Sequence, residues 1–555
     1  MENNNFKLAI LSSFTITGLT NFLVDEFKKI SVIPQFYVGA YNQYAKEILD
    51  ERSGLYNFHP DLIIIFIDTQ ALLGESFFFP YRLNADERRN WVKNSLADLS
   101  LLINTIKKRA SAKILVHNLE VPTYSSLGIL ESKEDFGIVE AVETFNAELR
   151  QACKIDNNVF LFDYNNFCSK IGKDNITDPK MYYLGDIKIA LNNFKALAHE
   201  YTSFIRPLLS LSKKCIVLDL DNTLWGGVIG EDGMSGIKLG PTPEGRSFLE
   251  FQKTLLALYE IGLLLAVNSK NNFDDAIKAI REHPNMVLRE NHFASVKINW
   301  QDKAANLKEI AKDLNIGLDS FVFIDDDKVT RQMVKDFLPE VEVVDLPEDT
   351  ALYPVVLKKI NSLNILQITE EDKSRGAMYQ IEKNRVELRN SAKDYSDFIK
   401  SLNLTATMLS ANSFTVPRIS QLTQKTNQFN LTTRRYSENQ IEELTKSGDF
   451  FISCFQAADK FGDYGITGVA IIKSQNENWI IDTFLLSCRI LGKNLEFAIM
   501  KALLDDAKTR GVKKIAGNFI PTANNKTAEN FYRDCGSAIY SRLPTIFKFF
   551  AFSIR

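Results

Sequence analysis

The stretch CIVLDLDNTLWGGVIGEDG, residues 215–233, predicts both the fold and the chemistry of the middle of this chain. Its apolar run, residues 216–218, stops at two acids, Asp219 and Asp221, and a glycine-rich segment follows. A short apolar run of this kind is typical of a buried strand in a parallel sheet. Polar groups that follow such a strand lie at the carboxyl edge of the sheet, where open α/β proteins bind their ligands.

Two further apolar runs end in chemically useful groups. LLLAVNS ends at Ser269 and FVFIDDD reaches Asp325 and Asp326, while Lys303 begins a predicted helix between them. Carboxylates that converge from separate strands repel one another unless a cation neutralises them, and hard oxygen ligands favour Mg²⁺. A hydroxyl and a lysine opposite them suit a phosphoryl group, whose charge needs electrostatic clamping. These residues predict Mg²⁺-dependent phosphoryl transfer.

The order DxDxT, serine, lysine and DD resembles motifs one to four of the haloacid dehalogenase (HAD) superfamily. The resemblance implies that Asp219 is the nucleophile of a phosphoaspartyl intermediate and that Asp221 is the general acid and base. It also implies that Ser269 and Lys303 hold the phosphate. The implied metal ligands are Asp219, the main-chain carbonyl of Asp221, Asp325, and Asp326 nearby or through water. A single DxD after a strand is commonly just a pair of solvated acids, but four motifs in order favour the site.

The stretches between these motifs are too short for a large lid domain. The segment between Asp219 and Ser269 is already occupied by the glycine-rich stretch and one predicted helix, and the segment from Ser269 to Lys303 is shorter still. We therefore expect a small flap and a site that admits a bulky or protein-tethered substrate.

Longer motifs narrow the resemblance. KCIVLDLDNTLWGGVIGEDG, LAVNSKN, INWQDKAANLKEIAKDLNIGLDSFVFIDDD and LTQKTNQFNLTTRRY resemble the FkbH-like family, in which a HAD domain of subfamily IIIC is fused to an acyltransferase-like domain. The family dephosphorylates a phosphoglyceryl donor and loads glyceryl onto an acyl carrier protein. One departure concerns the paired acids, which the family commonly follows with Asn-Pro and then Glu-Arg. In this sequence Asp327-Lys328 and Thr330-Arg331 occupy those positions. Lys328 is interpreted either as a partner of Asp325 or Asp326 that weakens metal binding or, preferably, as a solvated loop lysine.

Length and patterning predict three domains, at residues 1–210, 211–367 and 368–555. The first two alternate strand-like and helical stretches, which predicts α/β domains with parallel sheets. A charged helical stretch, residues 370–390, bridges to the third region. That region reads as helix, several strands, then helix, strand and helix, which predicts an α+β domain.

Composition excludes several classes of protein. A net charge of -3 gives no field that favours nucleic acid or anionic membrane. No apolar run approaches the ~20 residues that span a bilayer, and the start of the sequence lacks a signal-peptide pattern. The six cysteines form no CxxC pair, so a disulfide framework or zinc site is not expected, and a reducing cytoplasmic location is.

The third region also resembles the GNAT acetyltransferase fold. A predicted strand, a basic glycine turn and a long helix place Arg489 and Gly492 in a loop similar to the GNAT pyrophosphate loop, but Asn494 replaces its small last residue. The helix start suits a phosphate, and Asn525 in NKTAENFYRDCGSA is an expected acyl or pantetheine contact. Asn494 disfavours tight coenzyme A binding and leaves carrier-borne phosphopantetheine as the expected ligand.

Two features of this region have two interpretations each. Cys488 adjoins Arg489 and a helix start, which favours a reactive thiolate that carries glyceryl as a thioester; it is equally a small buried strand cysteine. ISQLTQKTNQFNLTTRRY is either a solvated helix end or a contact for a polar substrate or phosphopantetheine. Both pairs stay open.

The N-terminal region resembles SGNH hydrolases in fold. LAILSSFT places Ser12 and Ser13 after a first strand, where these enzymes carry their nucleophile. They also need a late Asp-x-x-His pair, and Asp186 is followed at that spacing by Ile189. We predict an SGNH-like, flavodoxin-type domain without hydrolase chemistry that serves as a docking surface.

The favoured function is a bifunctional glyceryl transferase and phosphatase that acts on a phosphorylated three-carbon acyl donor and an acyl carrier protein. A second hypothesis is a simple HAD phosphatase acting on a sugar or lipid-linked phosphate. A third is a non-catalytic assembly protein that recruits carrier proteins.

Overall fold

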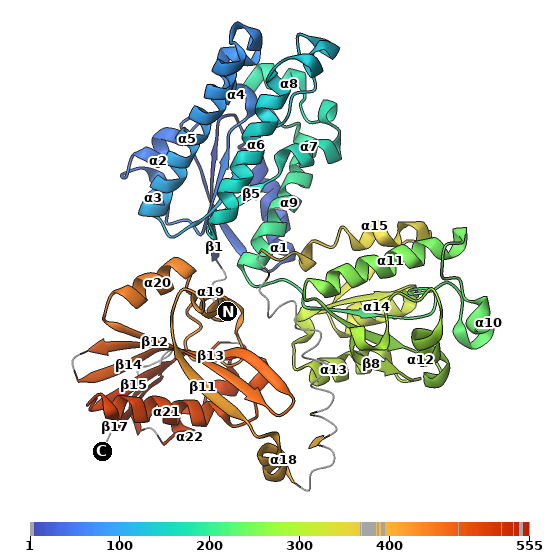
Figure 1. Ribbon diagram of the computed structural model, residues 1–555, viewed down its shortest axis with the longest axis vertical. Coiled ribbons are helices and arrows are strands. Elements are labelled where there is room, and N and C mark those ends of the chain that lie inside the picture. Colours follow the sequence, from blue (N-terminus) through green and yellow to red (C-terminus); the bar gives the residue numbers. More distant parts are fainter. Residues whose placement is uncertain are drawn as a thin grey trace. The chain divides into compact units, whose positions relative to one another are not determined.

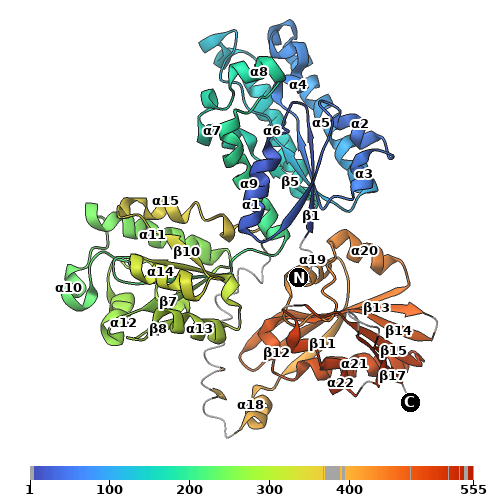
Figure 2. The same ribbon diagram turned by 180° about the vertical axis from the view of Figure 1, so that it is seen from behind.

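The computed structural model describes residues 5–366, 368, 385, 388, 389, 394–475, 477–522, 524–536, 538–542 and 548–553 (Figures 1 and 2). The chain forms two compact units, Met1–Ile205 and Arg206–Arg555, and each is described by itself. Most of the charged helical stretch predicted at residues 370–390 lies outside the described residues. No helix among the described residues is long and apolar enough to cross a membrane.

The first unit is built on a parallel sheet in the order β2-β1-β3-β4-β5, the flavodoxin-like order. Its strands are β1 (Asn5–Ser12), β2 (Ile33–Val38), β3 (Leu62–Phe66), β4 (Lys113–His117) and β5 (Val159–Phe162). All five residues of β3 are buried, because helices cover both faces of a parallel sheet. The predicted α/β class and flavodoxin-type order are therefore confirmed.

The helices of this unit form two layers. One core cluster joins β3 to α5 (Ala85–Arg109) and α6 (Ile138–Ile155). On the other face, ring contacts join α1 (Leu19–Lys29) to β1 and to α9 (Phe194–Leu208). The remaining helices are α2 (Tyr44–Leu49), α3 (Gly54–Phe58), α4 (Thr69–Leu73), α7 (Tyr164–Ile171) and α8 (Pro179–Gly185).

The middle region contains a second parallel sheet, in the order β10-β9-β6-β7-β8. Its strands are β6 (Cys215–Leu218), β7 (Leu264–Ser269), β8 (Phe293–Ile298), β9 (Phe321–Asp325) and β10 (Glu342–Asp345). Its helices are α10 (Ile229–Gly236), α11 (Pro243–Glu260), α12 (Phe273–Glu282), α13 (Lys303–Leu314), α14 (Lys328–Phe337) and α15 (Tyr353–Leu357). The sheet places β6 between β9 and β7, so the three strands predicted to carry site residues are neighbours.

Two apolar clusters hold this sheet between its helices. Leu218 and Leu265 pack with Phe251 of α11 and with α15 on one face, and Val217 and Ala266 pack with α13 and α14 on the other. In Figure 1, α11 and α15 lie on one side of the sheet and α13 on the other. Successive strand residues point to opposite faces, so each strand is buried on both.

The third region is a mixed sheet in the order β11-β12-β13-β14-β15-β17-β16. Its strands are β11 (Thr405–Ser410), β12 (Phe450–Asp459), β13 (Gly462–Gln475), β14 (Asn478–Leu486), β15 (Lys514–Phe519), β16 (Ala538–Arg542) and β17 (Lys548–Ser553). Its helices are α18 (Tyr395–Leu402), α19 (Val416–Lys425), α20 (Glu438–Lys446), α21 (Leu495–Thr509) and α22 (Phe531–Asp534). Among the described strands of this sheet, β14 and β15 form the parallel pair. The predicted α+β class is confirmed.

Candidate active site

The carboxyl edge of the middle sheet brings the predicted site residues together. Asp219 directly follows β6, Ser269 ends β7 and Asp325 ends β9. Lys303 is the first residue of α13, whose N-cap Asp302 accepts hydrogen bonds from the backbone of Ala304 and Ala305. Parallel strands carry their carboxyl ends to the same edge, and this places the acids beside the lysine.

Lys303 lies between two of the acids. Its Nζ is 2.8 Å from Asp219 Oδ2 and 2.6 Å from Asp325 Oδ2, and the residue is only 4% exposed. Burial acts to lower the pKa of Lys303, but the charges of Asp219 and Asp325 outweigh it, so the pKa is raised. The lysine therefore stays a cation, which can clamp a phosphoryl oxygen.

Three carboxylates form a group that fits a divalent ion. One oxygen each from Asp219, Asp325 and Asp326 lies within 4.8 Å of the others. The second oxygen of Asp219, Oδ1, is buried and has no hydrogen-bond partner. Burial and the neighbouring acids raise the pKa of Asp326 to about 6, and burial and Asp219 raise that of Asp325. An unpartnered buried oxygen among oxygen donors with raised pKa values fits Mg²⁺, which would favour their charged forms.

Asp221 faces a different environment. Its Oδ1 accepts hydrogen bonds from Trp225 Nε1 (2.8 Å) and the backbone of Ile229 (3.0 Å), and its Oδ2 accepts one from Asn271 Nδ2 (2.8 Å). Its side chain is not part of the three-carboxylate group, which agrees with the metal contact expected through its carbonyl. Burial raises the pKa of Asp221 although these donors oppose the shift. A raised pKa suits a group that gives and takes a proton.

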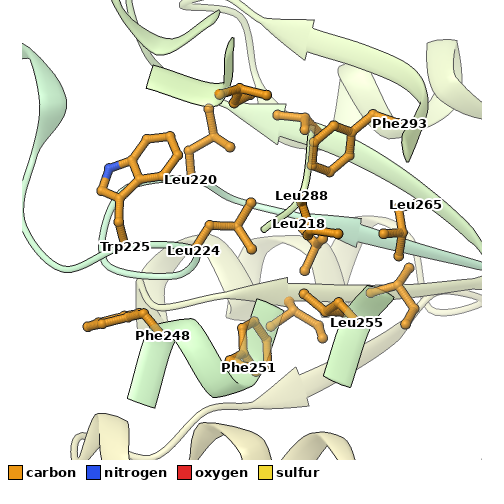
Figure 3. Close-up of a cluster of buried hydrophobic side chains, with 14 of the residues drawn as sticks. Leu218, Leu220, Leu224, Trp225, Phe248, Phe251, Leu255, Leu265, Leu288 and Phe293 are labelled. Atoms are coloured by element: carbon orange, nitrogen blue, oxygen red, sulfur yellow. The ribbon is translucent and has the colours of Figure 1, made fainter. Parts of the chain in front are cut away.

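The segment after Asp221 is short and is anchored in the core, and its role as a small flap over the site stays a prediction. Trp225 is fully buried, and Figure 3 shows it with Leu224 in the same cluster as Phe248 and Phe251. Helix α10 follows directly and leads towards α11. Because Trp225 is anchored in the core and also donates to Asp221, it fixes the position of the predicted acid and base.

Several residues that support the site were not found from the sequence. Arg331 is buried, and its Nη1 donates to the carbonyl oxygens of Asp325 and Asp326, both at 2.6 Å. Asn268 donates to the carbonyl of Lys303 at 2.9 Å and accepts from Asn306 at 3.0 Å. Asn271, which binds Asp221, is a third case. A buried amide or guanidinium beside a motif has no periodicity, so the sequence offered no signal beyond proximity.

The structure decides between the two interpretations of Lys328. Its Nζ lies 2.6 Å from Glu348 Oε1, and both side chains are largely exposed. Asp327 caps α14 by accepting from the backbone of Val329 and Thr330. Lys328 therefore pairs at the surface and not with the acids of the site.

In the third region, Cys488, Arg489 and Gly492, which were predicted to act in acyl transfer or to bind pantetheine, lie in the loop between β14 and α21. Cys488 is partly buried and begins a short 3₁₀ turn, Cys488–Ile490. Arg489 Nη1 donates to the carbonyl of Tyr464 at 3.2 Å. Gly492 and Asn494 both have left-handed backbone, with φ of 73° and 61°, a conformation that asparagine tolerates better than most residues. The roles predicted for Cys488, Arg489 and Gly492 stay predictions.

Asn525 is fully buried and serves the fold. Its Nδ2 donates to the carbonyls of Asn430 and Ile520, both at 2.9 Å, and its Oδ1 accepts from the backbone of Thr522. Its role as a ligand contact stays a prediction. The segment that it holds belongs to LTQKTNQFNLTTRRY, where Phe429, Asn430 and Leu431 are buried. Helix α19 does end within this stretch, at Lys425, but the residues beyond the helix end are not solvated, because residues 429–431 are buried and pair with β14.

In the first unit, Ser13 is paired with an acid. Its Oγ donates to Asp68 Oδ2 at 2.9 Å, and Lys188 Nζ lies 3.2 Å from Asp68 Oδ1. His117, the last residue of β4, lies in the core, with Nε2 2.8 Å from the hydroxyl of Tyr201, and burial holds its pKa well below the usual range. The absence of hydrolase chemistry in this domain stays a prediction.

Comparisons with known proteins agree with this architecture. Residues 21–206 match the family model of the FkbH N-terminal domain, and residues 214–367 match that of the NLI interacting factor-like phosphatase. A crystal structure of the N-terminal part of BF1531 from Bacteroides fragilis, containing a phosphatase domain complexed with Mg, is 29% identical. The alignment covers 66% of this chain and 95% of the Bacteroides fragilis chain, with a TM-score of 0.61. Among the curated proteins, none matches.

Solved acetyltransferases align with the third region. The ribosomal-protein-S18-alanine N-acetyltransferase from Escherichia coli is 17% identical, covering 27% of this chain and 94% of that chain, with a TM-score of 0.22. Spermidine N-acetyltransferase from Vibrio cholerae is 16% identical, and the alignment covers 27% of this chain and 95% of the acetyltransferase, with a TM-score of 0.22.

The middle sheet, with its four motifs at one edge, defines a HAD-type phosphatase domain. The region before it, residues 21–206, matches the N-terminal domain of FkbH.

Proposed function

We propose that this protein removes phosphate from a phosphoglyceryl donor, similar to 1,3-bisphosphoglycerate, and loads glyceryl onto an acyl carrier protein. One observation carries the phosphatase half. Lys303 bridges Asp219 and Asp325 while the second oxygen of Asp219 lies buried without a partner. A nucleophilic carboxylate beside a fixed cation is what transfer of a phosphoryl group requires.

In the proposed reaction, an oxygen of Asp219 attacks phosphorus and the bond to the leaving oxygen breaks. Asp221 gives its proton to that oxygen. Water then attacks the phosphoaspartyl group, Asp221 takes the proton of the water, and phosphate leaves with Asp219 restored. Ser269 and Lys303 hold the phosphate oxygens throughout.

Asp219, Asp325, Asp326 and the carbonyl of Asp221 are the residues that would hold Mg²⁺. The bound ion supplies positive charge that offsets the acids and the phosphoryl oxygens. The Mg in the similar structure from Bacteroides fragilis supports this choice of ion. Arg331 keeps the backbone of Asp325 and Asp326 in place through their carbonyls.

The acyl half is assigned to the third region. The sulfur of Cys488 attacks the acyl carbon of the donor's acyl phosphate, the carbon–oxygen bond breaks, and phosphate leaves as a thioester forms. Hydrolysis of the remaining phosphate ester at the HAD-type site leaves glyceryl, which passes to the thiol of the carrier protein. A neutral glyceryl group is easier to bury than a phosphorylated one, so the two activities support each other.

Intact-protein mass spectrometry of the full chain with holo acyl carrier protein and 1,3-bisphosphoglycerate tests this proposal. We expect the carrier to gain one glyceryl group and phosphate to be released. Cys488→Ala should stop loading, while Cys535→Ala, a second partly buried cysteine of the same region, should not. Phosphate release that ignores both the carrier and Cys488→Ala would favour a simple phosphatase. Carrier binding without turnover, unchanged by Asp219→Asn, would favour an assembly protein.

A further inference from the structure

Strands β14 and β15 separate part-way along their length. They pair in parallel from Asn478 with Lys514 to Ile481 with Gly517, and β14 then continues to Leu486 without β15 beside it. Such a split leaves backbone N–H and C=O groups on the inner side of β14, where an extended ligand can add itself as a strand. Helix α21 begins just beyond, and the N-terminus of a helix is in general an anion-binding position. A thiol cofactor with an extended arm and a phosphate end, such as coenzyme A, would be expected there.

The chain itself fills this split. The backbone N–H of Leu431 donates to the carbonyl of Phe484 at 3.0 Å, and that of Leu486 donates to the carbonyl of Phe429 at 2.9 Å. On the other side, the N–H of Ile520, just past β15, donates to the carbonyl of Leu431 at 2.8 Å. The inner backbone of β14 is therefore already paired, by a segment that also reaches the end of β15.

Side chains anchor this segment, residues 428–432. Asn525 donates to the carbonyl of Asn430 at 2.9 Å, and Thr527 donates to that of Gln428 at 2.6 Å. Leu431 is fully buried. The ring of Phe429 lies 5.3 Å from that of Phe531, in the main core cluster of the sheet. Displacing the segment would expose both apolar side chains and unpair the backbone groups.

The helix start beyond the split is also poorly suited to a pyrophosphate. Asn494, where the GNAT loop has a small residue, is the N-cap in left-handed backbone, with no side-chain capping hydrogen bond. Glu496 lies in the first turn of α21. A charged carboxylate in the first turn interacts favourably with the positive end of the helix and repels a phosphate, although burial raises the pKa of Glu496.

We infer that the third region does not bind coenzyme A, because residues 428–432 permanently occupy the place between β14 and β15. The same occupancy excludes a carrier-borne pantetheine arm from the sheet. Given the proposed function, on which this second statement rests, the arm meets Cys488 from outside the sheet, and the acyl donor is an acyl phosphate and not an acyl-coenzyme A.

Calorimetric titration of the full chain with coenzyme A tests the inference. We expect no binding at about 1 mM ligand, whereas a 1:1 complex with a Kd of about 10 µM or tighter would overturn it. Hydrogen exchange gives a second readout. The amides of Leu431, Leu486 and Ile520 should be protected like those of the central strands, and exchange as fast as an exposed loop would also overturn it.

A matched pair of variants tests whether the hydrogen bonds of Asn525 protect the amide of Leu431 from exchange. Asn525→Ala should speed exchange at Leu431 by at least tenfold, while Asn478→Ala, an exposed asparagine at the start of β14, should leave it unchanged. Equal exchange in both would mean that the anchor does not hold the segment. These results can be distinguished from a failure of the proposed function. If the chain neither binds coenzyme A nor loads the carrier protein, only the proposed loading is refuted. If it binds coenzyme A, this inference is refuted whether or not loading occurs.

Discussion

The ammonium group of Lys303 lies 2.8 Å from a carboxylate oxygen of Asp219, and both residues are buried. The lysine is the first residue of a helix and the acid directly follows a strand, so two rigid elements fix the distance between them. Asp219 thereby keeps one oxygen on a cation and the other free of hydrogen bonds. That asymmetry is what a nucleophilic carboxylate needs, since the unbonded oxygen is available to phosphorus.

Replacing Asp219, the proposed nucleophile, should abolish phosphate transfer. Asp219→Asn keeps the shape of the side chain but removes its negative oxygen, so we expect hydrolysis of acetyl phosphate to fall by at least about 10³-fold. Circular dichroism should show the fold unchanged. Activity above a tenth of the original rate would mean that another group attacks phosphorus.

Removing the cation should destabilise the site. Lys303→Met leaves Asp219, Asp325 and Asp326 close together without their shared partner, and breaking a buried ion pair typically costs about 3–5 kcal/mol. We expect a lower unfolding temperature for the phosphatase domain, partly restored by Mg²⁺ because the ion replaces the lost charge. Thermal unfolding with and without Mg²⁺ measures both effects; equal transitions in variant and parent would contradict the assignment of Lys303.

The raised pKa of Asp326 predicts a pH dependence with a definite sign. The pKa of Asp326 is about 6 in the fold and lower in the unfolded chain. Protonation of Asp326 therefore stabilises the fold, and this stabilisation is complete below about pH 4 and is lost as pH rises through 6. Two pKa units correspond to roughly 3 kcal/mol at most. Mg²⁺ competes with the proton, so its stabilising effect should be small at pH 5 and larger at pH 7.5. Thermal shifts at these two values test this, and a larger shift at pH 5 would refute it.

Arg331 should act through the backbone that it holds. Arg331→Lys keeps the charge but loses the fork that reaches the carbonyls of Asp325 and Asp326. We expect kcat to fall about tenfold with little change in KM, and the Mg²⁺ concentration at half activity to rise. Arg281→Lys, at an exposed pair with Glu290, is the matched control. Similar losses in both variants would show a general effect of removing arginine.

Lys328 should be dispensable. Because it pairs with Glu348 at the surface, where an ion pair contributes about 0–1 kcal/mol, Lys328→Ala should change neither acetyl phosphate hydrolysis nor the Mg²⁺ requirement by more than about twofold. A clear gain in Mg²⁺ affinity would instead show that the lysine reaches Asp325 or Asp326 in solution.

The sequence predicted the main members of the site because they follow a rule of parallel sheets. An apolar strand that ends in an acid or a hydroxyl places that group at the carboxyl edge, so Asp219, Ser269 and Asp325 could be grouped from the order of residues alone. The same rule says nothing of Asn271 or Arg331. Their roles depend on hydrogen bonds made in the fold, and a lone amide or guanidinium carries no periodic pattern.

The third region shows a feature that the sequence could not predict. Its strands and its long helix followed from their apolar patterns, whereas the polar stretch around Asn430 was interpreted as a helix end or a ligand contact. Its pairing with β14 uses backbone groups, which every residue has, so no side-chain pattern revealed it.

The sequence by itself determined the class of each sheet and the order of the phosphate-site motifs, because strand burial and the position of strand ends are written in local patterns of apolar and charged residues. Tertiary structure alone decided that Lys328 turns to Glu348, that Asn525 serves the fold, and that residues 428–432 fill the split in the last sheet. Each of these contacts joins positions far apart in the chain, and their partners are chosen by packing in three dimensions and not by neighbours in the sequence.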